Sequence, residues 1–167
     1  MKKSKLQCEH NIEPIYNVDS RVLILGSFPS VKSRENKFFY SHPKNRFWKV
    51  LPSIFEEEEP MTIEEKKAFL IRHRIALWDV IASCEIVGSS DSSIQNVVVN
   101  DISRILATAD IKAIYANGTK AAMLYERYLS PVCKREIIKL PSTSPANASW
   151  SLERLIQEWK CVRLHMN

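Results

Sequence analysis

Aromatic, amide and hydroxyl side chains gather in short polar segments of this 167-residue chain. One segment, residues 36–48, contains several aromatic residues, among them Tyr40, between Asn36 and Asn45. Aromatic rings offer faces for stacking on a nucleobase, and amides pair with its donor and acceptor edge. Hydroxyl and backbone N–H groups suit phosphate oxygens. These residue types therefore favour a nucleic-acid ligand.

Three further polar segments have the same character, at residues 26–30, 117–118 and 141–147. With residues 36–48 they contain few carboxylates and neither a P-loop nor a G-x-G-x-x-G fingerprint, which are the usual signs of a nucleotide site. Asp79 ends an apolar run, and its side chain is expected to face the site that these polar segments form. A helix-cap or ion-pair role is expected for Asp79 rather than catalysis.

Four short apolar runs come before these segments, at residues 21–25, 75–80, 111–116 and 136–140. Each is typical of a buried parallel strand. Because the loops that follow parallel strands gather at one edge of the sheet, the polar segments are expected to meet there. Residues 79–93, which include the polar run 88–93, are expected to be one of these loops.

Helical patterns alternate with the strands. Asn45 is the expected N-cap of the first helix, and Thr62 with Glu65 has capping-box spacing for the second. The expected helices cover residues 45–55, 63–73, 101–109 and 119–129, with a last one from Ser149 or Ser151 to about residue 159. The alternation predicts one α/β domain over residues 1–167, a three-layer α/β/α arrangement around a mainly parallel sheet of four to five strands, with an irregular N-terminal segment at residues 1–20.

Composition narrows the class further. The formal net charge of +5 and a pI near 9.0 weakly favour a polyanionic partner. The apolar runs are too short to span a membrane, so an intracellular protein is expected. Four scattered cysteines have neither a C-x-x-C pair nor zinc-site spacing, so reduced thiols and no metal site are expected.

Three stretches resemble motifs of the uracil-DNA glycosylase superfamily. Gly-Ser-Phe-Pro-Ser at residues 26–30 resembles its first motif, and Leu-Pro-Ser-Thr-Ser-Pro-Ala-Asn at 140–147 falls where the second is expected. The block YSHPKNRFWKV, residues 40–50, is very similar to the corresponding segment of the mismatch-specific uracil-DNA glycosylases. The resemblance spans about residues 21–160 and is greatest to the hypoxanthine-DNA glycosylase branch.

The resemblance implies a uracil-DNA glycosylase-like fold and a monofunctional base-excision repair enzyme. Water would hydrolyse the N-glycosidic bond of a flipped deaminated base, chiefly hypoxanthine, without a cofactor, a metal ion or a lysine Schiff base. The substrate would be double-stranded DNA with a damaged or deaminated base, bound by a monomer that is cytoplasmic and associated with the nucleoid. Binding should weaken with salt.

The resemblance also assigns residues. Asn45 matches the catalytic position of the hypoxanthine branch. Phe28 and Ser142 stand where most relatives have an acid or amide and a His or Asn, departures that the hypoxanthine branch shares. Base-binding roles fall on Phe28, Tyr40, His42 and Asn117, and DNA-phosphate or minor-groove roles on Ser27, Ser30, Ser142, Ser144, Pro145, Ala146 and Asn147.

Plainer readings stay open at this point. Asn45 also suits a helix N-cap, Tyr40 a core aromatic, His42 a structural loop residue and Asn117 a left-handed turn. Residues 141–147 also suit a proline turn before a helix. Alternative functions are a uracil or mismatch-specific DNA glycosylase, a non-catalytic nucleic-acid-binding module on the same fold, and a hydrolase of small nucleotides.

Overall fold

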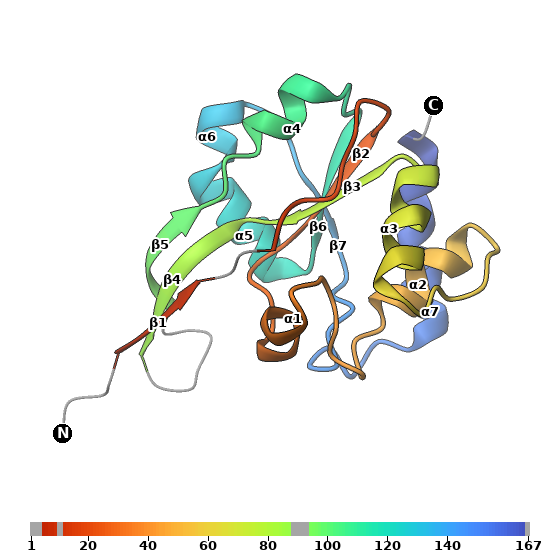
Figure 1. The fold of residues 1–167 in the computed structure, drawn as a ribbon, viewed down its shortest axis with the longest axis horizontal. Coiled ribbons are helices and arrows are strands. Elements are labelled where there is room, and N and C mark those ends of the chain that lie inside the picture. The colour runs from red at the N-terminus through yellow and green to blue at the C-terminus, as the bar shows by residue number, and fades with distance from the viewer. Residues whose placement is uncertain (1–4, 10–11, 88–93, 166–167) are drawn as a thin grey trace.

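Four parallel strands form the central sheet of the computed structural model, which describes residues 5–9, 12–87 and 94–165 (Figure 1). The strands lie in the order β3-β2-β6-β7. Their bounds are Val22–Gly26 for β2, Ile75–Asp79 for β3, Ala113–Asn117 for β6 and Ile138–Leu140 for β7. All four expected strands are therefore confirmed.

The middle of this sheet is apolar because helices cover both of its faces. Val22, Leu23, Ile24 and Leu25 of β2 have no exposed surface, as expected for a central parallel strand. In Figure 1, α2, α3 and α7 lie on one side of the sheet, and α4, α5 and α6 on the other. The fold is thus the expected three-layer α/β/α arrangement, with four strands in its parallel sheet.

Most of the helices follow the expected ranges. Thr62 and Ser151 cap the N-termini of α3 and α7, since each side chain accepts a backbone N–H three residues ahead. The bounds are Val31–Asn36 for α1, Phe47–Ile54 for α2, Ile63–Arg72 for α3, Ser103–Thr108 for α4, Thr119–Tyr128 for α5, Ser130–Cys133 for α6 and Leu152–Trp159 for α7, which continues as a 3-10 helix, Lys160–His165.

A second, antiparallel sheet was not expected from the sequence. It has the order β1-β4-β5 and consists of Lys5–Glu9, Ile81–Val87 and Ile94–Val99. The expectation of an irregular N-terminal segment is wrong for β1, and that of a loop over residues 79–93 is wrong for β4. Residues 88–93 of that expected loop lie outside the described residues. β1 pairs with β4 across 82 positions at its start (Lys5 with Val87), a partnership that no local pattern reveals.

The segment between β2 and α2 also contains more structure than expected. Short helix α1 begins after Ser30, whose Oγ accepts a hydrogen bond from Ser33 N at 3.1 Å. Ser33 Oγ in turn accepts from Ser41 N at 3.0 Å, which joins α1 to the loop that leads to Asn45. The loop that carries the candidate catalytic residue is therefore joined to α1 by a hydrogen bond. None of the described helices has the length and apolar character needed to cross a membrane.

Candidate active site

The carboxyl ends of the four parallel strands form one row. Gly26 is paired with Asp79, and Asn117 with Leu140, while Leu25 opposite Ala116 sets β2 against β6 in the same register. The loops after β2 and β7 therefore meet beside α1 at this edge, which lies at the bottom of Figure 1. The row brings Asp79 and Asn117 within two strand spacings, roughly 10 Å, of each other.

Thr143 joins Asn117 to Asn45 by a continuous set of hydrogen bonds. Thr143 N donates to Asn117 Oδ1 at 3.0 Å, and Asn117 Nδ2 donates to Thr143 Oγ1 at 3.0 Å. Thr143 Oγ1 lies 2.9 Å from Asn45 Oδ1, and Phe47 N donates to the same oxygen at 2.9 Å. Thr143 has no exposed surface, whereas Asn45 and Asn117 are half-buried.

Two backbone N–H groups fix every proton in this network. Phe47 N and Thr143 N can only donate, so the atoms that face them must be the amide oxygens of Asn45 and Asn117. Asn117 then donates to Thr143, and the single hydroxyl proton of Thr143 must go to Asn45 Oδ1. The Asn45 oxygen is thereby doubly occupied. The Nδ2 group, which can only donate, is then the part of the Asn45 side chain that these bonds leave for a ligand.

The expected N-cap role of Asn45 holds only in part. The N-cap residue of α2 is Arg46, whose side chain makes no capping bond. Asn45, one position earlier, accepts from Phe47 N instead, in an Asx turn. The same side chain therefore bonds both to the first turn of α2 and to Thr143.

Tyr40 has a buried hydroxyl and a ring that packs on Phe47. The two rings are stacked, with centroids 4.1 Å apart and planes inclined by 19°. The backbone of Tyr40 has a φ of 53°, an unusual conformation for a bulky residue. Burial, and then the nearby Asp79 carboxylate, raise the pKa of the Tyr40 hydroxyl well above its usual range, while the nearby Asn117 amide opposes the rise.

Asp79 is a buried carboxyl group, with only 3% of its surface exposed. A Cβ on Gly26 would overlap its carboxylate and would lie 2.9 Å from the Tyr40 hydroxyl oxygen, so Gly26 is what allows the two groups to approach. Loss of water around the carboxyl raises the pKa of Asp79 to about 7. The expected helix-cap or ion-pair role is wrong, because strand β4 follows Asp79 and no cation of the described residues pairs with it.

Arg46 holds the loop that follows β7. Its guanidinium donates to the carbonyl oxygens of Trp150, Ser144 (3.3 Å) and Asn147 (3.0 Å). Its backbone N donates to Thr143 O at 3.0 Å. One residue of the block at 40–50 thus fixes both the path of the second loop and the position of Thr143.

The second loop also bonds to itself. Ser142 Oγ accepts from Ser144 N at 3.1 Å, Ser144 Oγ accepts from Ala146 N at 3.2 Å, and Asn147 Nδ2 donates to Ser142 O at 3.0 Å. Pro145 and Ala146 are exposed at its tip. The loop is therefore a preformed turn that presents small side chains to solvent.

The first loop brings the remaining candidate residues to the same edge. Phe28 is half-buried, with the Arg34 guanidinium 5.3 Å above its ring centre. Ser30 is engaged as the cap of α1, and Ser27 O accepts from Ile81 N at 3.0 Å. His42 Nδ1 accepts from Lys44 N at 3.1 Å, which leaves Nε2 as its outward nitrogen.

Three residues of this edge escaped the sequence-based assignment. Thr143 lies inside a quoted motif, yet nothing local distinguishes it from its serine neighbours. Arg46 was named only within the block at residues 40–50, and Asp79 was expected to be structural. The left-handed turn expected as an alternative for Asn117 is wrong, since the positive φ of 99° belongs to Gly118.

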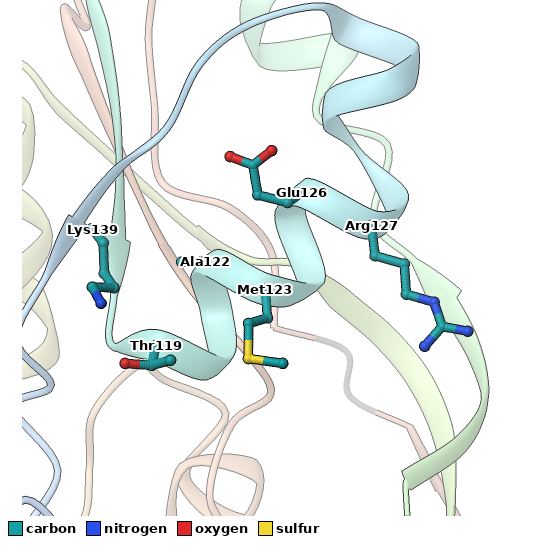
Figure 2. Close-up of a pocket in the computed structure, with 6 residues that line it drawn as sticks. All are labelled: Thr119, Ala122, Met123, Glu126, Arg127 and Lys139. Carbon is teal, nitrogen blue, oxygen red and sulfur yellow. The ribbon is translucent and has the colours of Figure 1, made fainter.

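A separate groove of about 550 Å³ lies over α5 and β7 (Figure 2). It is lined by Thr119, Ala122, Met123, Glu126, Arg127 and Lys139. It contains none of the hydrogen-bonded residues described above.

Among the described residues, no group of three His, Cys, Asp or Glu side chains is arranged to hold a metal ion. We therefore place the candidate site at the strand ends, in a cluster of Asn45, Thr143, Asn117, Tyr40 and Asp79, called below the strand-end cluster.

Comparison with known proteins adds independent information. The family model of the uracil DNA glycosylase superfamily matches residues 13–163. A hypoxanthine DNA glycosylase of Methanosarcina acetivorans is 35% identical over 153 residues, which are 90% of this chain and 95% of that protein. A hypoxanthine DNA glycosylase of Methanosarcina barkeri is 32% identical over 110 residues, which are 65% of this chain and 70% of that protein.

A solved structure has the same fold. It is the solution NMR structure of a candidate uracil DNA glycosylase from Methanosarcina acetivorans, with a TM-score of 0.81 and 32% sequence identity. The match covers 96% of this chain and 99% of that one. The similarity thus extends over all the strands and loops that carry the strand-end cluster.

Proposed function

Because the chain belongs to the uracil DNA glycosylase superfamily, we propose that it is a DNA glycosylase that removes hypoxanthine from DNA. The reaction is hydrolysis of the N-glycosidic bond of a flipped nucleotide. The bond between C1′ and N9 breaks, and its electron pair leaves with the base. A water oxygen bonds to C1′, and the water gives up a proton to solvent.

The observation that carries this proposal is the fixed donor of Asn45. Because its oxygen accepts from Phe47 N and Thr143 Oγ1, its amine faces the ligand as a hydrogen-bond donor. Negative charge grows on hypoxanthine as the bond to C1′ breaks, and O6 shares that charge. A preorganised donor stabilises such a charge more in the transition state than in the ground state. Asn45 therefore assists departure of the base, and the intrinsic quality of hypoxanthine as a leaving group supplies the rest.

Aromatic and polar residues around Asn45 suit the other parts of the substrate. Phe28 and Tyr40 are the aromatic groups for the base, with His42 and Asn117 as polar neighbours. The backbone and hydroxyls of the two loops suit DNA phosphates, and the exposed tip at Pro145 and Ala146 suits the minor groove. The members of this second group are Ser27, Ser30, Ser142, Ser144, Pro145, Ala146 and Asn147.

The proposed substrate is double-stranded DNA that contains the deaminated base, and the proposed active unit is a monomer. The positive net charge of +5 supports binding of a polyanion. Contacts between basic side chains and phosphates release counterions, so the affinity for DNA should fall as salt is raised. A small-nucleotide hydrolase would lack this dependence.

The test is base release from defined duplexes. Wild-type protein, Asn45→Ala and Asn45→Asp are incubated with duplexes that contain hypoxanthine, uracil or xanthine, and abasic sites are then cleaved with alkali. Asn45→Asp keeps the accepting oxygen but loses the amine, so both variants should release hypoxanthine roughly 100-fold or more slowly than wild type. Asn36→Ala, an exposed substitution on α1, is the matched control.

Each outcome has a definite meaning. Binding of a hypoxanthine duplex without any base release by wild type would identify a non-catalytic binding module. Release of uracil alone would show that the substrate is uracil in DNA and not hypoxanthine. An Asn45→Asp variant as active as wild type would show that Asn45 does not act as a hydrogen-bond donor in the reaction.

A further inference from the structure

Two buried polar groups at the strand ends are not explained by the fold. Asp79 Oδ2 and the Tyr40 hydroxyl are buried from solvent and have no hydrogen-bond partner among the described residues. Leaving such groups unpaired costs free energy, most of all for a group that can carry charge. Both lie beside Gly26, the residue whose missing side chain makes room for them.

The surroundings of Asp79 offer no structural role for its carboxylate. Asn100 Nδ2 donates to the backbone oxygen of Asp79 at 2.9 Å, not to the side chain. No cation of the described residues forms an ion pair with it. The Tyr40 hydroxyl, from the loop before α2, lies close enough that Asp79 contributes to the rise of its pKa. A buried acid that serves neither a helix nor an ion pair points to a ligand.

We propose that Asp79 and the Tyr40 hydroxyl read the lactam edge of the flipped base, the N–H beside C=O that deamination creates. This inference rests on the proposed function and names the feature of the substrate that the site selects. Asp79 accepts the hydrogen bond from N1–H of hypoxanthine, and Tyr40 donates one to O6. Adenine presents an acceptor at N1 and an amino group at C6, the reverse pattern.

The hydrogen bonds that Asn117 already makes support this assignment. Asn117 ends the neighbouring strand and would otherwise be the amide that pairs with the base edge. Its oxygen is already taken by Thr143 N at 3.0 Å, and one of its amine protons by Thr143 Oγ1. Its amide plane is therefore fixed by Thr143, whereas Asp79 Oδ2 is a buried acceptor without a partner among the described residues.

Depth separates this role from that of Asn45. Asn45 is half-buried, whereas Asp79 is almost fully buried, beside Gly26 and Tyr40. The glycosidic bond must stay close to the DNA backbone, so the distal edge of the purine is the part that reaches deepest. Tyr40 belongs to a loop, and its ring stacks nearly parallel to that of Phe47.

The test pairs a protein change with a substrate change. Single-turnover release of hypoxanthine is compared with release of N1-methylhypoxanthine, which lacks N1–H, for wild type, Asp79→Asn and Asp79→Ala. Wild type should prefer hypoxanthine by roughly 10- to 100-fold or more. Asp79→Ala removes the acceptor and makes room for the methyl group, so it should release the two bases at rates within about threefold of each other.

Control variants separate selectivity from stability. Asp110→Asn removes an exposed acid paired with Lys112 and should keep the wild-type ratio of the two rates. Tyr40→Phe should lower hypoxanthine release with little change in the melting temperature. Asp79→Asn keeps the shape of the side chain but loses its charge and one accepting oxygen, so it reports on the charged acceptor even where Asp79→Ala folds poorly.

The outcomes distinguish this inference from the function on which it rests. No release of hypoxanthine by wild type overturns both. Release by wild type with the same preference for hypoxanthine over N1-methylhypoxanthine in folded Asp79→Asn and Asp79→Ala variants leaves the glycosylase standing and overturns the role of Asp79. Collapse of that preference in the Asp79 variants alone supports it.

Discussion

Thr143 Oγ1 donates a hydrogen bond of 2.9 Å to Asn45 Oδ1, and this bond joins two loops 98 residues apart in the sequence. The same oxygen of Thr143 accepts from Asn117 Nδ2. A single buried hydroxyl therefore sets the orientation of both amides. Because the Asn45 amine is aimed by this bond, loss of the hydroxyl should affect chemistry as well as stability.

Thr143→Val removes the hydroxyl with little change in shape. It leaves two amide groups without their buried partner, which should lower the free energy of unfolding by about 1–3 kcal/mol. The Asn45 amine should also lose its fixed direction, so kcat should fall while KM changes little. Steady-state kinetics and thermal unfolding measure the two effects. Thr143→Ser keeps the hydroxyl and should restore most of kcat, and a serine variant as slow as the valine variant would contradict the positioning role.

Arg46→Lys tests the connection between the two loops. A lysine ammonium cannot reproduce the planar fork that donates to Trp150, Ser144 and Asn147, although it keeps the charge. Amide hydrogen exchange should increase over residues 144–150, and the affinity for an abasic duplex should fall by roughly 10-fold. Lys49→Arg on the exposed side of α2 is the control. Unchanged exchange in that loop would mean that its own bonds are sufficient.

Gly26→Ala tests the close approach of Asp79 and Tyr40. The added Cβ would overlap the Asp79 carboxylate and lie 2.9 Å from the Tyr40 hydroxyl, so one of the two groups must move. Overpacking of this kind should cost about 1–3 kcal/mol of unfolding free energy. Hypoxanthine release should slow in the folded fraction. Chemical denaturation gives the stability, and an unaltered unfolding midpoint would show that the space beside Gly26 is larger than the structure indicates.

The buried Asp79 carboxyl should make stability depend on pH. Its pKa is raised to about 7 in the folded chain from an ordinary value of 3.8, so between these values the folded chain holds a proton that the unfolded chain has released. The favourable contribution of Asp79 is therefore present at low pH and is lost as pH rises through about 7. The difference should be on the order of a few kcal/mol.

Thermal unfolding of wild type and Asp79→Asn from about pH 5 to about pH 8 measures this effect. The wild-type melting temperature should decline more steeply over the range than that of the variant, since asparagine does not titrate. The slope is the readout, because the substitution also changes stability at every pH. Parallel curves for the two proteins would mean that Asp79 titrates normally.

Local patterns were enough to predict the parallel sheet and its helices. Strand β2 is a continuous apolar run followed by Gly26, and the caps Thr62 and Ser151 carry their own sequence signals. The antiparallel sheet was missed because β4 follows β3 with only Val80 between them, so one apolar run supplies strands to two sheets. Strand β1, which pairs with β4, lies more than 70 residues earlier in the chain.

The same limit applies to the site. Asn45 and Tyr40 were named from their types and their segment, and their roles remain predictions. Thr143 was given no role and Asp79 was expected to be structural, since their importance depends on which strand ends lie side by side. The register that sets Gly26 against Asp79 is a property of the folded sheet and has no local signal.

Arg46 has one further consequence, for how this site can change over time. Its guanidinium donates only to main-chain oxygens of the loop after β7, and every amino acid has such an oxygen. The shape of that loop is thus fixed by a residue outside it. Substitutions at the exposed positions Pro145, Ala146 and Ser149 should therefore leave the path of the loop unchanged. Evolution, or a designer, can exchange the side chains that are proposed to contact DNA while the backbone that carries them stays the same.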